Sequence, residues 1–86
     1  MAAIRARLEE QLSPSHLDLI DDSHRHAGHA GARDGRGHFS VHIVSAQFVG
    51  MNPLARHRAV YAALGELMTT DIHALVIDAR SPEETR

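Results

Sequence analysis

The 86-residue chain contains no cysteine and no lysine. Without cysteine it cannot form a disulfide, and it cannot by itself build a zinc-thiolate cluster or an iron-sulfur site held only by cysteines. A cysteine nucleophile is excluded for the same reason. Any thiolate ligand in a metal centre would therefore have to come from a partner.

Long apolar segments are also missing. No run reaches the roughly eighteen apolar residues that a membrane-spanning helix needs. The first twelve residues carry Arg5, Arg7, Glu9 and Glu10, where a secretory signal would require uninterrupted apolar residues. We therefore expect a cytoplasmic protein without a membrane association.

The length of the chain limits its organisation, because a protein of this size holds one hydrophobic core. We expect a single domain over residues 1–80. Residues 81–86 (SPEETR) are polar and are predicted to form a frayed C-terminal tail.

Histidine is unusually frequent, with eight residues against nine arginines. The formal charge is −2 with histidine neutral, and protonating all eight histidines would bring it to +6. The net charge therefore changes sign near the histidine pKa of about 6.5. A slightly acidic chain at pH 7 gives no general support for binding the phosphates of nucleic acid.

Hydrophobic periodicity predicts two helices and three strands in the order αββαβ. Apolar residues recur at helical spacing in the first segment, and Asn52 with Pro53 forms a typical start for the second helix. Apolar and polar residues alternate in the strands, so one face of the sheet is expected to be buried. The expected elements are helices at 2–12 and from Pro53 to about Thr69, and strands at 16–22, 38–45 and 72–79.

The order of these elements also predicts the sheet topology. The second strand, second helix and third strand form a βαβ unit, so these strands should be parallel, whereas the first two should be antiparallel. The glycine-rich segment 23–37 then leads into the end of the sheet where His73 opens the third strand. His24, His26 and His29 should thus lie near His73, although 44 positions separate His29 from His73.

Two interpretations of the H-x-H-x-x-H pattern in this segment remain open. A flexible chain can bring two imidazoles to one borderline metal ion, and His73 on a rigid strand end would supply an anchored ligand. A histidine-rich polar loop can equally be only solvated. His38 and His42 share one strand face roughly 13 Å apart, so they cannot chelate one ion together, and we interpret both as solvated.

No catalytic arrangement is recognisable. Ser23, Ser40 and Ser45 lack a nucleophile-elbow motif, and the glycine-rich segment precedes a strand, whereas a phosphate-binding loop precedes a helix. We therefore expect a protein that is not an enzyme.

Four motifs spread over most of the chain resemble those of BolA-like proteins. They are D-D-S-x-x-H at 21–26, G-H-F at 37–39, F-x-G-x-x-P-x-x-R-H-R-x-V-Y at 48–61 and H-A-L at 73–75. The resemblance implies an α+β fold similar to a class II KH domain, with a three-stranded mixed sheet and helices packed on one face.

The resemblance also implies a partner, a monothiol glutaredoxin of the C-G-F-S type, in iron-sulfur cluster trafficking or iron regulation. A heterodimer of this kind shares a bridged [2Fe-2S] cluster, to which the glutaredoxin cysteine and glutathione supply thiolates. His73 matches the histidine of H-A-L, and the second ligand corresponds to His26 or His29. The isolated chain is expected to be a monomer that holds no cofactor of its own.

A second role implied by the resemblance is DNA binding in transcriptional control. Gly50 to Pro53 reads G-x-x-P and lacks the second glycine of the G-x-x-G backbone clamp of KH domains. Arg56, His57 and Arg58 still form a basic patch that could contact phosphate or an acidic partner surface. A third possibility is metal binding or scaffolding by the chain alone.

Overall fold

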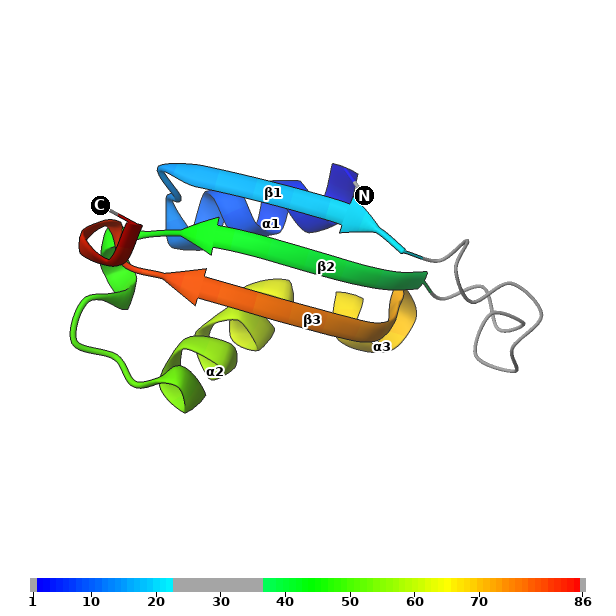
Figure 1. Ribbon diagram of the computed structural model, residues 1–86. Helices are drawn as coiled ribbons and strands as arrows, with labels where there is room; N and C mark the ends of the chain where they lie inside the picture. The colour runs from blue at the N-terminus through cyan, green and yellow to red at the C-terminus, as the bar shows by residue number, and fades with distance from the viewer. Residues whose placement is uncertain (1, 23–36, 86) are drawn as a thin grey trace.

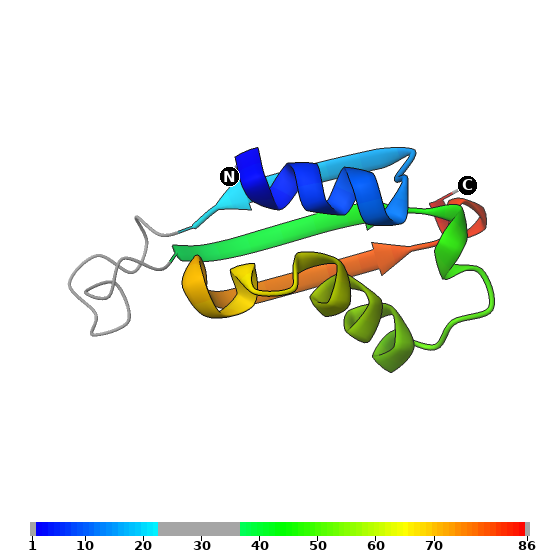
Figure 2. The same cartoon turned by 180° about the vertical axis from the view of Figure 1, so that it is seen from behind.

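The computed structural model describes residues 2–22 and 37–85, and these form a three-stranded sheet covered by helices on one face (Figure 1). Seen from behind, α1, α2 and α3 all lie in front of the sheet (Figure 2). Within these two ranges, no helix lies on the opposite face. The α+β architecture with helices on one face is confirmed. The elements are α1 (Ala2–Leu12), β1 (His16–Asp21), β2 (Gly37–Val44), η3 (Ala46–Phe48), α2 (Pro53–Leu64), α3 (Leu67–Thr70), β3 (Ile72–Arg80) and η4 (Pro82–Thr85).

The strand order is β1-β2-β3, with β2 in the centre. β1 pairs with β2 in antiparallel orientation, and β2 pairs with β3 in parallel. Both orientations agree with the sequence-based topology, and the predicted strand bounds are correct to within one residue. The amino-terminal ends of β2 and β3 consequently lie side by side.

The core lies between the helices and the inner face of the sheet. The alternation predicted for β2 is confirmed, because Phe39, Val41 and Ile43 are buried while His42 is exposed. One stripe of α1 faces these side chains, and Phe48 of η3 is fully buried. The helical side chains that complete the core are Ile4, Leu8, Leu12, Val60, Ala63, Leu64 and Leu67.

The start of α2 follows the expected capping pattern, but its end does not. Asn52 Oδ1 accepts a hydrogen bond from the Ala55 N–H at 2.8 Å, and Pro53 is the first helical residue. The helix stops at Leu64, so the predicted continuation to Thr69 is wrong. Gly65 has a φ of +55°, a left-handed conformation that favours glycine and ends the helix. The chain then turns into the short α3, which buries Leu67.

The predicted frayed tail at 81–86 is also incorrect for residues 81–85. Pro82–Thr85 form a 3₁₀ helix. Glu84 Oε1 accepts hydrogen bonds from the backbone N–H of Ser81 at 2.7 Å and from its hydroxyl at 2.9 Å. Arg56 of α2 forms an ion pair with the same carboxylate, so this segment is tied to the domain.

Leu8→Ala and Leu54→Ala form a matched pair that tests this core. Leu8 is 0% exposed and Leu54 is 59% exposed, and both lie on helices. Leu8→Ala should lower the free energy of unfolding by about 2–5 kcal/mol, because it leaves a cavity. Leu54→Ala should change it by no more than about 0.5 kcal/mol. Urea unfolding followed by circular dichroism measures both, and equal losses would contradict this assignment of the core.

Candidate functional site

His73 lies on an irregularity in the parallel pairing of β2 and β3. Gly37 pairs with Ile72, but the next residue of β2, His38, pairs with Ala74. β3 therefore has one extra residue at this point, and that residue is His73. Bulges of this kind redirect a side chain and are common next to functional sites.

The bulge changes which side chains of β3 face the core. Ile72 is buried, and Leu75 and Ile77 pack against the core, so the inward positions are separated first by three residues and then by two. A regular strand would place Ile72 and Leu75 on opposite faces. The extra residue lets Ile72 and Leu75 both face the core, and His73 is left exposed at the amino-terminal end of β3.

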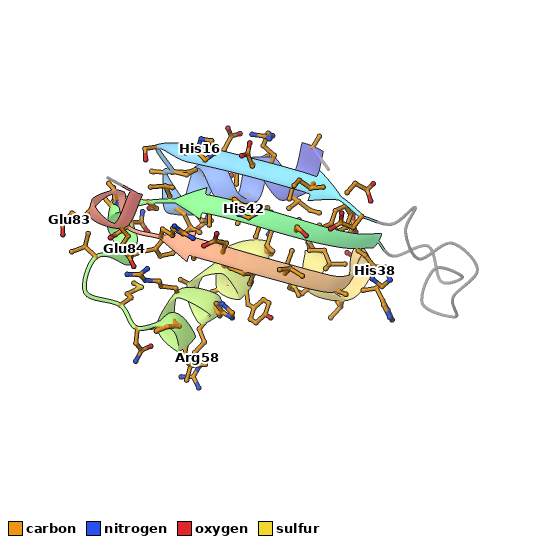
Figure 3. The ribbon with its side chains drawn as sticks, in the orientation of Figure 1. His16, His38, His42, Arg58, Glu83 and Glu84 are labelled. Carbon is orange, nitrogen blue, oxygen red and sulfur yellow. The ribbon has the colours of Figure 1, made fainter. Side chains whose placement is uncertain are left out.

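His38 lies directly beside His73. The centroids of the two imidazole rings are 5.0 Å apart, and the ring planes are inclined by 50°. His38 is half-buried, and its Nε2 atom is shielded from solvent. Figure 3 labels His38 at the end of the sheet where β2 begins. The interpretation of His38 as a solvated residue was therefore wrong.

Backbone hydrogen bonds hold this end of the sheet together. The Asp22 N–H donates to the His38 carbonyl at 2.7 Å, and the Gly37 N–H donates to the Asp71 carbonyl at 2.9 Å. The Ser40 hydroxyl donates to Asp22 Oδ2 at 2.6 Å. β1, the start of β2 and the turn before β3 thus converge around the two histidines.

The histidines at 24, 26 and 29 lie outside the described residues, so the proposed ligands His26 and His29 stay predictions. Their segment connects Asp22 to Gly37, and both of these lie at the sheet end that carries His73. Within residues 2–22 and 37–85, no three histidine, aspartate or glutamate side chains converge to hold a metal ion. His38 and His73 are the two imidazoles that lie side by side in the described part of this sheet end.

The open face of the sheet carries the remaining strand histidines. His42 is exposed, as predicted, and its Nδ1 lies 3.1 Å from Asp78 Oδ2, while His16 Nε2 lies 3.0 Å from Asp18 Oδ2 (Figure 3). A hydrogen bond from Arg80, with a smaller contribution from His42, holds the pKa of Asp78 below its usual value. These pairs form a polar, solvated surface.

The predicted basic patch is divided between two environments. Arg58 is exposed and projects from α2 (Figure 3), whereas the Arg56 side chain is only 13% exposed. Arg56 donates to the carbonyls of Met51 at 3.0 Å and Ala79 at 3.1 Å and pairs with Glu84. Arg56 thus joins α2, β3 and η4, and its charge is used within the chain.

Arg56 and His57 line a groove of about 380 Å³ between α2, the carboxyl half of β3 and η4. Its cations and carboxylates are paired, since Arg56 bonds to Glu84 and Arg80 bonds to Asp78. The groove is about 20 Å from the histidines, at the other end of β3. Its lining is Pro53, Arg56, His57, Ile77, Asp78, Ala79, Arg80 and Glu84.

Comparison with known protein families identifies the family of this chain. The family described as BolA-like protein matches residues 8–84. The chain belongs to the BolA-like family. BolA-like protein 1 of mouse is 48% identical over 85 residues, which cover 99% of this chain and 60% of the mouse protein. The DNA-binding transcriptional regulator BolA of Escherichia coli is 39% identical over 85 residues, covering 94% of this chain and 78% of that protein.

Solved structures agree with the family assignment. The structure of BolA1 from Arabidopsis thaliana superposes on this BolA-like chain with a TM-score of 0.84 at 42% identity, covering 99% of this chain and 94% of the other. The chain spans about three-fifths of the length of the mouse relative. No helix in the described part of the chain is long and apolar enough to cross a membrane.

In this BolA-like protein the sequence predicted a role for His73, but it did not predict that the imidazole of His38 lies beside it. One signal was available in the spacing of Ile72, Leu75 and Ile77, which breaks the two-residue period of a strand. A bulge placed there aligns the two histidines.

The ion pair that anchors η4 should make stability depend on pH through Glu84. The backbone N–H of Ser81, followed by the Arg56 side chain, lowers the pKa of Glu84 from about 4.5 to about 2. A lowered pKa in the folded state stabilises the protein above pH 4.5, and this contribution disappears as the pH falls towards 2. Wild type should therefore unfold at a higher urea concentration than Glu84→Gln at pH 7, and the gap should close near pH 2.

Glu83→Gln, which changes the neighbouring exposed carboxylate, is the control for the loss of one negative charge. It should keep the wild-type urea midpoint. A Glu84→Gln deficit that persists unchanged at low pH would show that the carboxylate charge is not the cause.

Proposed function

We propose that this BolA-like protein is a cytoplasmic, non-enzymatic partner of a monothiol C-G-F-S glutaredoxin and shares a bridged [2Fe-2S] cluster with it. The observation that carries the proposal is the exposed His73, held on a strand bulge in a chain without cysteine. A rigidly placed imidazole at the edge of the molecule is accessible to a second protein. Sites built on strands hold ligand geometry better than sites on loops.

The donor groups of the chain fit a shared centre. Histidine nitrogen replaces cysteine on one iron in Rieske clusters, so imidazole ligation of a [2Fe-2S] cluster has a chemical precedent. With no cysteine here, thiolates would come from the glutaredoxin and glutathione. His73 would be one protein ligand and His26 or His29 the second. Such ligation raises the reduction potential compared with a cluster held by four thiolates.

Imidazole ligands also make the complex sensitive to pH. A protonated imidazole has no lone pair for iron, so ligation competes with protonation. The shared centre should therefore weaken as the pH falls. A centre held only by the glutaredoxin and glutathione thiolates would not depend on these histidines.

His73→Ala tests the proposal in a titration of the chain into a cluster-loaded C-G-F-S glutaredoxin with glutathione. Wild type should change the visible absorption and circular dichroism of the cluster, and His73→Ala should abolish that change because the anchored ligand is gone. The control is His42→Ala, which removes an exposed histidine from the open sheet face. It should behave as wild type.

Two results would contradict the proposal. An unchanged spectrum with wild type would mean that no cluster is shared. A full spectral change with His73→Ala would mean that His73 is not a ligand.

A second candidate function, DNA-binding transcriptional regulation, is supported by the E. coli relative, which is named a DNA-binding transcriptional regulator, and by the groove that Pro53, Arg56 and His57 line. Arg56, His57 and Arg80 lie along this groove, and Arg58 projects from the same helix. The pairing of Arg56 with Glu84 and of Arg80 with Asp78 reduces the positive charge offered to phosphates. We therefore rank this function second.

Arg58→Ala is the informative substitution for DNA binding, because Arg56 also supports the fold. If the chain binds duplex DNA through this surface, Arg58→Ala should weaken binding similarly for different sequences. It should also reduce the slope of log affinity against log salt concentration by the amount that corresponds to about one phosphate contact. Fluorescence anisotropy at several salt concentrations measures both quantities. Arg5→Ala on α1 is the control for the loss of one arginine, and equal effects of the two substitutions would contradict a DNA site at α2.

A further inference from the structure

We propose that His38 and His73 together bind a single divalent transition-metal ion in the isolated protein. The ion would belong to the class that favours imidazole, which includes Cu²⁺, Ni²⁺ and Zn²⁺. This inference does not depend on the proposed glutaredoxin partnership. It assigns a ligand role to His38, which the sequence patterns did not suggest.

The separation of the two rings fits bidentate coordination. With metal–nitrogen bonds of about 2.1 Å and a tetrahedral angle at the metal, two coordinating imidazoles have ring centroids about 5 Å apart. The observed separation is 5.0 Å. The inclination of 50° between the rings keeps them from lying flat against each other. The separation of the rings is therefore compatible with both imidazoles binding one ion.

Both side chains start from rigid backbone, which favours binding. His38 lies on the central strand, where its carbonyl accepts from the Asp22 N–H on one side and its backbone pairs with Ala74 on the other. Partial burial and the shielded Nε2 atom restrict its ring. His73 is held by the bulge in β3. Ligands fixed in this way lose little conformational entropy when the ion binds.

The surroundings favour a cation without completing its coordination. Asp22 and Asp71 lie at the same end of the sheet, with their backbones bonded to His38 and Gly37. Their negative charge attracts a divalent ion. Since no set of three ligating side chains exists among residues 2–22 and 37–85, water is expected to fill the remaining positions. Such a site binds in the Irving–Williams order, with Cu²⁺ as the strongest probe.

The experiment is a Cu²⁺ titration of the full chain followed by electron paramagnetic resonance. His24, His26 and His29 are first replaced by asparagine, so that they cannot contribute. His38→Asn and His73→Asn are then made separately in this background. Each should lower Cu²⁺ affinity by about tenfold or more, because even substitutions of groups that only orient a metal ligand cost about 10–100-fold.

The matched control is His42→Asn in the same background. His42 lies on the same strand and the same face as His38, four residues further along, but its partner is Asp78. It should keep the affinity of the parent. Equal affinities for His38→Asn and His42→Asn would overturn the proposal, as would unchanged affinity for His73→Asn.

A second measurement keeps the proposal testable if a variant fails to fold. Long-range ¹H–¹⁵N spectra of the unsubstituted chain during a Zn²⁺ titration show which ring nitrogens bind the ion. His38 and His73 should shift together, and a shift of His73 alone would overturn the proposal. Neither experiment contains glutaredoxin or glutathione, so a negative result leaves cluster sharing untouched, and a failure of cluster sharing leaves this site untouched.

Discussion

The parallel pairing of β2 with β3, interrupted by one extra residue, is the constraint on which the candidate site depends. Parallel pairing brings the amino-terminal ends of both strands to one edge of the molecule. The bulge at His73 lets Ile72 and Leu75 both face the core while the intervening imidazole stays exposed. A regular strand could bury Ile72 or align Leu75 and Ile77 with the core, but not both. Core packing therefore determines where the histidine lies.

The same strand separates two chemically different regions. Its beginning carries two neighbouring imidazoles, suited to soft or borderline metals. Its end borders a groove in which Arg56 and Arg80 are paired with carboxylates. Arg56 links the helix, the strand edge and the C-terminal 3₁₀ helix, so its main role is structural. The pairing of both arginines leaves this groove little free positive charge for binding phosphate.

Much of the fold followed from local patterns in the sequence. The two-residue alternation of β2 predicted its buried face, and Asn52 with Pro53 predicted the start of α2. The end of α2 was missed because the apolar spacing continues past Gly65, where only the backbone conformation stops the helix. The docked tail was missed because SPEETR is polar, and its attachment depends on Arg56, distant in sequence. The contact between His38 and His73 was not predicted because the two residues belong to different strands. A bulge in β3 determines how these strands are aligned.

We propose that an imidazole of this chain ligates a cluster shared with a glutaredoxin. The most direct test labels the histidines of this chain with ¹⁵N, assembles the mixed complex with unlabelled glutaredoxin and glutathione, and records pulsed electron paramagnetic resonance of the reduced cluster. We expect ¹⁵N hyperfine coupling from these histidines, and the contribution of His73 should be lost when this residue is replaced by alanine. A cluster with no coupling to the labelled histidines would contradict it.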